Sequence, residues 1–282
     1  MKVTYFEDTA LVRTPPSLSF LQSLKRPALI AMIHVGALPG TPRSRKRVAE
    51  LCRDAVSEGL LLAKAGVDAI ILENMHDVPY LNRCVGPEVV AAMTAVCAAV
   101  RGTTDLPLGV QVLAGANRES ISVATAAGLQ FVRCEGFVFS HVADEGLMAD
   151  ADAGPLLRFR RAVSAEDVAV IVDIKKKHSA HAITADIEIA ETARAAVYCG
   201  AQGVIVTGGA TGHAARVADV AAAADSIDEP VFVGSGVTPD NVRDYADLAD
   251  GLIVGSYLKR DGCWENPPDP KRVRAMVRAV RG

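Results

Sequence analysis

Several acids and cations of this chain stand at the carboxyl ends of short apolar runs. Glu73 ends one such run, Arg133 and Glu135 end another, and Asp173 lies near the end of a third. A carboxyl group that is partly desolvated at such a point has its pKa raised toward neutrality, where it can transfer protons. Glu73 is therefore the best candidate for a general base, and Asp173 is a second acid–base candidate.

A row of three lysines and a histidine, Lys175 to His178, follows the third of these runs. Strand alternation predicts that Asp173, Lys175 and Lys177 share one face. A charged row does not lie beneath covering helices, so we expect it to point into an open mouth. A lysine there can hold an anion or act as an acid, a base or a Schiff-base amine, although lysine runs are also typical of solvated surface. Lys177 and His178 are predicted to hold or polarise the substrate.

Further polar residues at the same rim are candidates for contact with a substrate. His34 ends the first apolar run, where it either serves the chemistry or is a core histidine with satisfied hydrogen bonds. His76 and Glu135 are predicted to point into one mouth as an acid–base or metal-ligand pair, with solvated loop positions as the alternative. The predicted substrate-binding residues are Asn74, His76, Asp77, Arg133, Asp144 and Lys175.

Glycines and hydroxyl residues follow the last three apolar runs. Glycine lets backbone N–H groups approach an anion closely, and serine and threonine add hydroxyl donors. Single glycines commonly do no more than close tight turns, but three adjacent turns of this kind favour a phosphate site. The predicted phosphate-binding residues are Thr207, Gly208, Gly209, Gly234, Ser235, Gly236, Gly255 and Ser256.

Metal and thiol chemistry have weaker support in the sequence. Six acids and imidazoles at the rim are of the right type to surround a divalent cation, but they show no fixed ligand spacing and the expectation is no certain cofactor. The six cysteines form no CxxC pair and are expected to be reduced core residues, with Cys134 an unfavourable nucleophile. The six candidate metal ligands are Glu73, Asp173, Glu135, His34, His76 and His178.

The elements that must position these residues form a regular series. Eight β-branched runs are each followed by a helical pattern, and near-continuous apolar strands imply a parallel sheet covered by helices. Eight such units predict a (β/α)8 barrel over residues 28–282, with an N-terminal extension over residues 1–27. The expected strands are Ala28–Val35, Asp68–Glu73, Leu106–Leu113, Gln130–Glu135, Val168–Ile174, Gly203–Thr207, Pro230–Gly234 and Gly251–Gly255.

Helices and loops complete the predicted barrel. Two connections, Met75–Val85 and Gly136–Gly154, are long enough to act as lids or to contact substrate. The helix over Glu88–Val100 is so apolar that a partner subunit is expected to help cover it. The other expected helices are Arg47–Ala65, Ile121–Ala127, Leu156–Val163, Ala185–Tyr198, Ala214–Ala224, Asp240–Ala246 and Pro270–Val280.

Composition and charge exclude several classes of protein. Of the 282 residues, 30 are Lys or Arg and 33 are Asp or Glu, a net charge of −3 that gives no electrostatic footprint for nucleic acid. No apolar run approaches the roughly 20 residues that span a bilayer. Glu7 and Asp8 interrupt any signal-peptide core. We therefore expect a cytoplasmic protein, and a homo-oligomer is possible.

A series of ordered motifs runs along nearly the whole chain from Ala28 to Val280. The motifs are Met32–Pro42, Glu73-Asn74 with Asp77 and Pro79, Asp144–Gly146, Lys177-His178, Thr207-Gly208 with Thr211-Gly212, Gly234–Pro239 with Asn241, and Ala249–Ser256 followed by Lys259 and Asp261-Gly262. Taken together, they resemble the BtpA/SgcQ family. The resemblance implies a TIM barrel of the phosphate-binding type. The family name comes from a role in photosystem I biogenesis, but its spread through organisms without photosynthesis suggests a metabolic ancestral function.

Departures from the family pattern gather at the predicted rim. Relatives commonly have Glu-Asn-Phe-Gly-Asp where this chain has Met75 and His76 at the third and fourth positions, and Arg-Val-Asn where it has Cys134 and Glu135 after the arginine. His181 stands where proline is frequent. These changes add ionisable groups, so they put the transfer of any family substrate in doubt.

The expected function is a TIM-barrel enzyme for a small phosphorylated metabolite, either a sugar phosphate or a nucleotide-like ribosyl phosphate. The reaction is expected to be that of a lyase, an isomerase or an enzyme of glycosidic-bond cleavage, driven by acid–base chemistry. The alternative is a non-catalytic assembly or stability factor of the photosystem type. The row of ionisable rim residues favours catalysis, because a scaffold does not need it.

Overall fold

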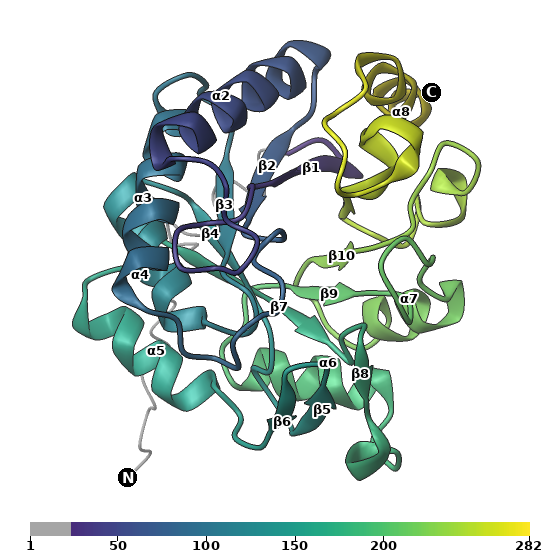
Figure 1. Cartoon of the computed structure of the whole chain (residues 1–282). Helices are drawn as coiled ribbons and strands as arrows, with labels where there is room; N and C mark the ends of the chain where they lie inside the picture. Colours follow the sequence, from purple (N-terminus) through teal and green to yellow (C-terminus); the bar gives the residue numbers. More distant parts are fainter. Residues whose placement is uncertain (1–23) are drawn as a thin grey trace, which may run out of the picture.

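The computed structural model describes residues 24–282, and the predicted N-terminal extension lies almost wholly outside them. Eight parallel strands close into a barrel, and helices surround it (Figure 1). The predicted (β/α)8 fold is confirmed. The barrel strands are β1 (Ala28–His34), β2 (Ala69–Glu73), β3 (Leu108–Gln111), β4 (Phe131–Cys134), β7 (Ala169–Ile174), β9 (Val204–Val206), β10 (Val231–Val233) and β11 (Gly251–Val254).

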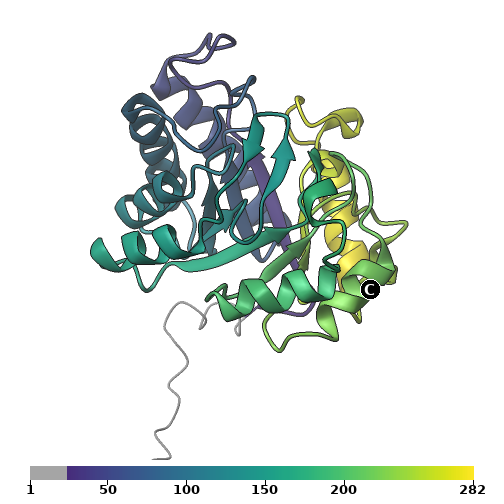
Figure 2. The ribbon, with the colours of Figure 1, turned by 90° about the horizontal axis from the view of Figure 1, so that it is seen from below.

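The helices cover the outside of the barrel because each turns one apolar stripe toward it. Helices α2, α3 and α4 pack side by side along one flank, and Figure 2 shows them from below. Helix α2 ends at Ala65, as predicted, and Gly66 caps it with a φ of +92°. The helices are α2 (Val48–Ala65), α3 (Pro87–Arg101), α4 (Asn117–Ala127), α5 (Ala153–Ala162), α6 (Ile189–Tyr198), α7 (Val217–Ala224) and α8 (Pro270–Arg281).

The predicted helix over Asp240–Ala246 is wrong. Only one turn of 3₁₀ helix, η2 (Val242–Asp244), forms there. The Asn241 side chain accepts a hydrogen bond from the backbone of Thr238 at 2.8 Å and donates one to the carbonyl of Gly236 at 2.9 Å. Side-chain to backbone hydrogen bonds of this kind compete with the backbone hydrogen bonds of a helix. Here they fix the turn that precedes η2.

The long loop Gly136–Gly154 is not irregular throughout. It carries a hairpin of β5 (His141–Ala143) and β6 (Gly146–Met148), and β5 also pairs with β8 (Ser179–Ala180) from the connection after β7. This small antiparallel sheet joins two barrel connections that are about forty positions apart in the sequence. None of the helices between residues 24 and 282 combines the length and the apolar character needed to cross a membrane.

Inside the barrel, aromatic and glycine positions fill the interior together. The rings of Phe131 and Phe232 are buried among inward-facing apolar residues. A Cβ on Gly109 would lie 2.3 Å from the Phe131 ring, and one on Gly251 would lie 2.8 Å from the Phe232 ring. The absence of a side chain at each glycine therefore leaves room for the neighbouring ring. Small and large residues fill the interior of this barrel together. The interior is packed up to the layer at which the strands end.

Candidate active site

A polar layer lies directly above the apolar interior. On each strand the residue two positions beyond an inward-facing core residue also faces inward, because side chains alternate along a strand. We call the resulting set the rim layer. It consists of His34, Glu73, Gln111, Arg133, Asp173, Thr207, Gly234 and Gly255.

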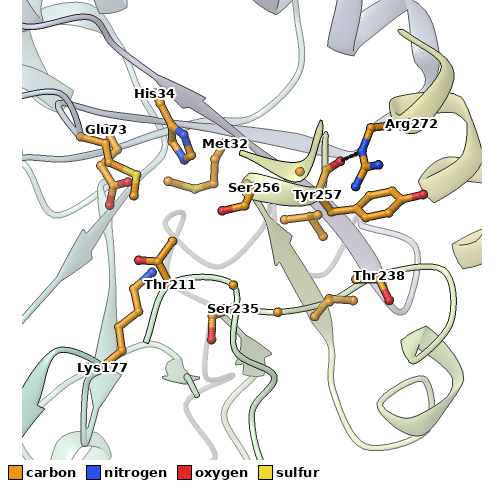
Figure 3. Close-up of a pocket in the computed structure, with 18 of the residues that line it drawn as sticks. Met32, His34, Glu73, Lys177, Thr211, Ser235, Thr238, Ser256, Tyr257 and Arg272 are labelled. Atoms are coloured by element: carbon orange, nitrogen blue, oxygen red, sulfur yellow. Dashed lines mark hydrogen bonds between the residues drawn. The ribbon is translucent and has the colours of Figure 1, made fainter. Parts of the chain in front are cut away.

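A cavity of about 160 Å³ opens above one side of the rim layer. Figure 3 shows Glu73 and Lys177 facing it from one side, with Ser256 and Arg272 on the other. The position matches the carboxyl end of the barrel strands, where active sites of this fold lie. Four predicted catalytic or substrate-binding residues and five of the eight predicted phosphate-binding residues line this cavity. They are His34, Glu73, Arg133, Lys177, Gly234, Ser235, Gly236, Gly255 and Ser256.

Glu73 lines this cavity as a nearly buried carboxyl group, 8% exposed. No hydrogen-bond donor reaches its carboxyl oxygens from any residue between 24 and 282. Burial raises the pKa of Glu73, and the nearby charges of Arg133 and Lys177 offset only part of that effect. A carboxyl group that is unengaged and holds its proton more firmly than usual suits proton transfer.

His34 faces the same cavity in a defined tautomer. Its Nδ1 donates a hydrogen bond of 2.9 Å to the carbonyl of Trp264. Burial and the charge of Lys259 hold the pKa of His34 well below its usual value, so the ring is neutral. Nε2 is consequently a free acceptor, and it lies toward the turn at Gly255. The buried Lys259 is itself paired with Glu58 of α2.

Asp173 and Arg133 form a buried bidentate ion pair. Arg133 Nε and one terminal nitrogen donate to the two oxygens of Asp173 at 2.7 and 2.8 Å. The side chain of Arg133 is 5% exposed and that of Asp173 is 1% exposed. Burial alone would lower the pKa of Arg133, but the charge and hydrogen bonds of Asp173, together with the charges of Glu73 and Glu135, outweigh burial and raise that pKa. Both oxygens of Asp173 are occupied, which differs from the free carboxyl group expected of a proton-transfer residue.

The three lysines of the predicted row do not all line one cavity. Strand β7 ends at Ile174, and Lys175 adopts a φ of +45°, so the alternation does not continue. Lys175 donates to the carbonyl of Thr184, and Lys176 is buried 3.1 Å from Glu135. Lys175 lines a smaller cavity together with Asp173 and Lys176, and it does not line the cavity of Glu73. Lys177 does line the cavity.

Two of the three predicted phosphate turns line the cavity. Backbone of Gly234–Thr238 after β10 and of Gly255–Tyr257 after β11 forms its wall. The N–H groups of Gly236, Val237 and Gly255 have no acceptor among the residues that the structure describes. Gly236 has a φ of +66°, and a Cβ there would lie 2.2 Å from the backbone of Ala214. Two adjacent turns with free N–H groups form a concave donor surface that suits an anion.

The third turn, after β9, supports the other two. The N–H of Gly208 donates to Ser235 Oγ at 2.7 Å, and Ser235 Oγ donates to the carbonyl of His213 at 2.8 Å. Thr207 Oγ1 accepts from the backbone of Lys177 at 3.0 Å. Neither Gly208 nor Gly209 lines the cavity, whereas Thr211 and Gly212 of the same connection do.

His178 anchors this connection. Its Nε2 lies 2.9 Å from the hydroxyl of Thr211 and accepts from the backbone N–H of Thr211 at 3.1 Å. The Nδ1 side lies 3.8 Å from the exposed carboxylate of Asp144. His178 thus positions a wall of the cavity and does not line it.

Asn74 and Asp77 tie neighbouring connections together. Asn74 accepts from the backbone of Leu113 at 2.7 Å and donates to Asp77 at 2.8 Å. The other oxygen of Asp77 accepts from the backbone of Leu38 at 2.8 Å. These two predicted substrate-binding residues have their polar atoms engaged within the protein.

The predicted pair of His76 and Glu135 does not form. His76 packs against Trp264 with ring centroids 5.0 Å apart and lines a separate cavity beside the connection after β1. Glu135 is buried and bonded to Lys176. Side chains alternate between two faces only within a strand. His76 and Glu135 both come after the end of their strands, so this alternation does not direct them into one cavity.

Because these groups share no partner, we expect the substitutions Glu135→Asn and His76→Gly to act independently on stability. Glu135→Asn leaves Lys176 with only Glu145, at 4.0 Å, and is expected to lower the free energy of unfolding by about 1–3 kcal/mol. Urea unfolding of both single variants and the double variant checks this. A double variant that departs from the sum by more than about 0.5 kcal/mol contradicts it.

The six candidate metal ligands are not brought together. No group of three or more His, Cys, Asp or Glu side chains suited to a metal gathers within residues 24–282. The cysteines of this region are all free thiols, and Cys134 is buried with a pKa well above its usual value. That pKa, raised mainly by burial, agrees with the expectation that Cys134 is a poor nucleophile.

Three site residues escaped the sequence reasoning. Arg272, in the first turn of α8, lines the cavity beside the turn after β11, and its Nε donates to the carbonyl of Tyr257. Thr211 lines the opposite wall. Gln111, in the rim layer between Glu73 and Arg133, has neither amide atom hydrogen-bonded. Its position two residues after the inward-facing Gly109 is the signal that would have found it.

Comparisons with known proteins agree on family and fold. The model of the BtpA family matches residues 25–282. An uncharacterized mitochondrial protein of Caenorhabditis elegans is 43% identical over 267 residues, which cover 93% of this chain and 96% of that protein. The photosystem I biogenesis protein BtpA of Synechocystis is 34% identical over 254 residues, covering 89% and 87%.

Two solved structures share the fold at low sequence identity. One is (S)-3-O-geranylgeranylglyceryl phosphate synthase from Thermoplasma acidophilum, with a TM-score of 0.60, 14% identity and coverage of 94% of this chain and 96% of that one. The other is N-(5'-phosphoribosyl)anthranilate isomerase from Pyrococcus furiosus, with a TM-score of 0.53, 14% identity and coverage of 90% and 98%.

Proposed function

Since this chain belongs to the BtpA family, and its barrel presents free backbone donors beside unengaged acid–base groups, we propose that it is an enzyme acting on a small phosphorylated metabolite. The observation that carries the proposal is the pair of turns after β10 and β11, with unpaired N–H groups at Gly236, Val237 and Gly255. Arg272 supplies positive charge at the same wall. The substrate would be a sugar phosphate or a ribosyl phosphate.

Proton transfer would be carried out by Glu73 and His34, which line the same cavity and have free polar atoms. Glu73 carries a raised pKa and acts as the acid, while neutral His34 offers a free Nε2 and acts as the base. Two titratable groups with pKa values displaced in opposite directions are typical of acid–base sites. Arg133, held by its ion pair with Asp173, also lines this cavity.

The names of proteins with the same fold support the choice of substrate class. The Thermoplasma acidophilum synthase was solved with sn-glycerol-1-phosphate, and the Pyrococcus furiosus isomerase is named for a phosphoribosyl substrate. Lyase, isomerase and glycosidic-bond chemistry all require the proton transfers that Glu73 and His34 would provide.

The substitution Arg272→Gln tests the phosphate site. It removes a charged donor from the cavity wall, so the affinity for sn-glycerol-1-phosphate is expected to fall by roughly 10- to 150-fold, the equivalent of about 1.5–3 kcal/mol. Calorimetry or ligand-induced thermal stabilisation measures the change. Arg274→Gln, on an exposed position of the same helix, is the matched control. Equal affinities of the two variants would remove Arg272 from the site.

A second candidate function is supported by one comparison. The relative from Synechocystis is named for photosystem I biogenesis, which favours an assembly factor that binds without catalysis. An assembly role does not depend on proton transfer, so Glu73→Gln would leave it intact. Loss of the cellular function in that variant, with normal protein levels, therefore favours the enzyme.

A further inference from the structure

Lys177 is the amine in the cavity that the proposed acid–base roles leave unused. Its backbone is fixed by the bond to Thr207, while its ammonium group has no hydrogen bond or ion pair with any residue from 24 to 282. Figure 3 shows the side chain extending into the cavity toward Glu73, beside Thr211. Its surroundings differ from those of the two buried lysines, Lys176 and Lys259, which are both ion-paired.

The electrostatics shift this amine toward its uncharged form. Burial and the neighbouring guanidinium of Arg133 lower the pKa of Lys177, and the carboxylates of Glu73 and Asp173 offset only part of this. An amine next to another cation and partly removed from water loses its proton more readily than a free lysine, which makes it a better nucleophile. Because Arg133 is locked to Asp173 by two hydrogen bonds, this cation stays beside Lys177.

We propose that Lys177 forms a Schiff base with the carbonyl carbon of a phosphorylated aldehyde or ketone whose phosphate lies on the turns after β10 and β11. The free Nζ and the donor turns line one cavity, so a small substrate would reach both. The assignment rests on the proposed phosphate site and narrows its substrate to carbonyl compounds.

The proton movements balance with the groups present. The Nζ lone pair attacks the carbonyl carbon, a C–N bond forms, and the oxygen takes the proton of Glu73. His34 Nε2 accepts one proton from the nitrogen and returns it to the hydroxyl group, which leaves as water. The products are a protonated imine on Lys177, a carboxylate on Glu73 and one water molecule.

The resulting charges suit the site and restrict the reaction. The imine cation lies where Glu73 has become an anion. A protonated imine withdraws electrons from the adjacent C–H or C–C bond, which is the chemistry of an isomerase or a lyase. Cleavage of a glycosidic bond, the third reaction class proposed, is not helped by a protonated imine.

Reductive trapping tests the assignment on the whole protein. The chain is incubated with dihydroxyacetone phosphate, glyceraldehyde 3-phosphate or ribose 5-phosphate, and borohydride reduces any imine to a stable secondary amine. Intact mass and peptide mapping are expected to show one adduct per chain, on Lys177. Unphosphorylated glyceraldehyde is expected to give at least roughly tenfold less adduct at equal concentration, since it lacks the group that the turns hold.

Two variants complete the experiment. Lys177→Arg is expected to abolish the adduct, while Lys64→Arg, on the exposed face of α2, is expected to retain it. Peptide mapping of the unaltered protein locates the adduct even if Lys177→Arg folds poorly.

The outcomes separate this inference from the proposed function. Phosphate esters that stabilise the protein without any adduct on Lys177 overturn the Schiff base and leave the phosphate site standing. Adducts spread over surface lysines, with no preference for phosphorylated compounds, also overturn it. If none of the three phosphorylated compounds binds, the proposed phosphate site fails as well.

Discussion

Asp173→Asn is expected to lower the free energy of unfolding by about 3–5 kcal/mol, because it leaves the buried guanidinium of Arg133 without its counter-charge. The Arg133 side chain is only 5% exposed, so water does not replace the lost carboxylate. Urea or thermal unfolding measures the effect. The effect is one on stability and needs no activity assay, because Asp173 acts by holding Arg133, which lines the cavity.

A double variant provides the control for this prediction. Arg133→Met with Asp173→Leu removes both charges and keeps the volume apolar, so it is expected to be more stable than Asp173→Asn alone. If Asp173→Asn unfolds at the same urea concentration as the unaltered protein, the pair does not contribute in this way and Asp173 returns to the list of proton-transfer residues.

Glu73→Gln is expected to reduce turnover of a phosphorylated substrate by roughly 10²- to 10⁴-fold, the range for loss of a general acid or base. Its effect on stability has the opposite sign to that of Asp173→Asn. The pKa of Glu73 is raised in the folded state, so the folded protein binds more protons than the unfolded chain above a pH of about 4.5. Stability therefore falls as the pH rises through this window toward the folded pKa.

Glutamine removes this pH-dependent loss. At neutral pH the Glu73→Gln variant is expected to be as stable as the unaltered protein or more stable, and the difference shrinks as the pH falls toward 4.5. Thermal unfolding between pH 4.5 and 8 checks the sign. Glu191→Gln, at an exposed position of α6, is the control and is expected to change neither turnover nor this pH profile. A marked destabilisation of Glu73→Gln would mean that the carboxyl group is structural.

The barrel was predictable because its strands are buried on both faces. The ends of an apolar run such as Val168–Ile174 mark the ends of the strand. The observed strand starts one residue later and ends at the same residue. The small sheet was not predictable in this way. Its strands are only two or three residues long and partly exposed, so they bury too little apolar surface to leave a periodic pattern.

The site was predictable where strand geometry carries the side chain and less so beyond it. Glu73 and His34 lie in the last positions of their strands, and both face the cavity. Lys175 comes after a strand, where a positive φ redirects it. Arg272 reaches the cavity from a helix about 200 residues away from Glu73, so only the closure of the barrel brings the two together.

The closed order of the barrel strands also limits how another polypeptide can attach. Over residues 24–282 the eight-stranded sheet joins β1 to both β2 and β11, which leaves it no open edge for strand addition. The small sheet is open, with β6 and β8 at its two sides. The side chain of Leu147 on β6 is exposed, as is that of Val142 on β5. A partner that extends a sheet of this protein through main-chain hydrogen bonds would do so there, beside the connection that carries Lys177.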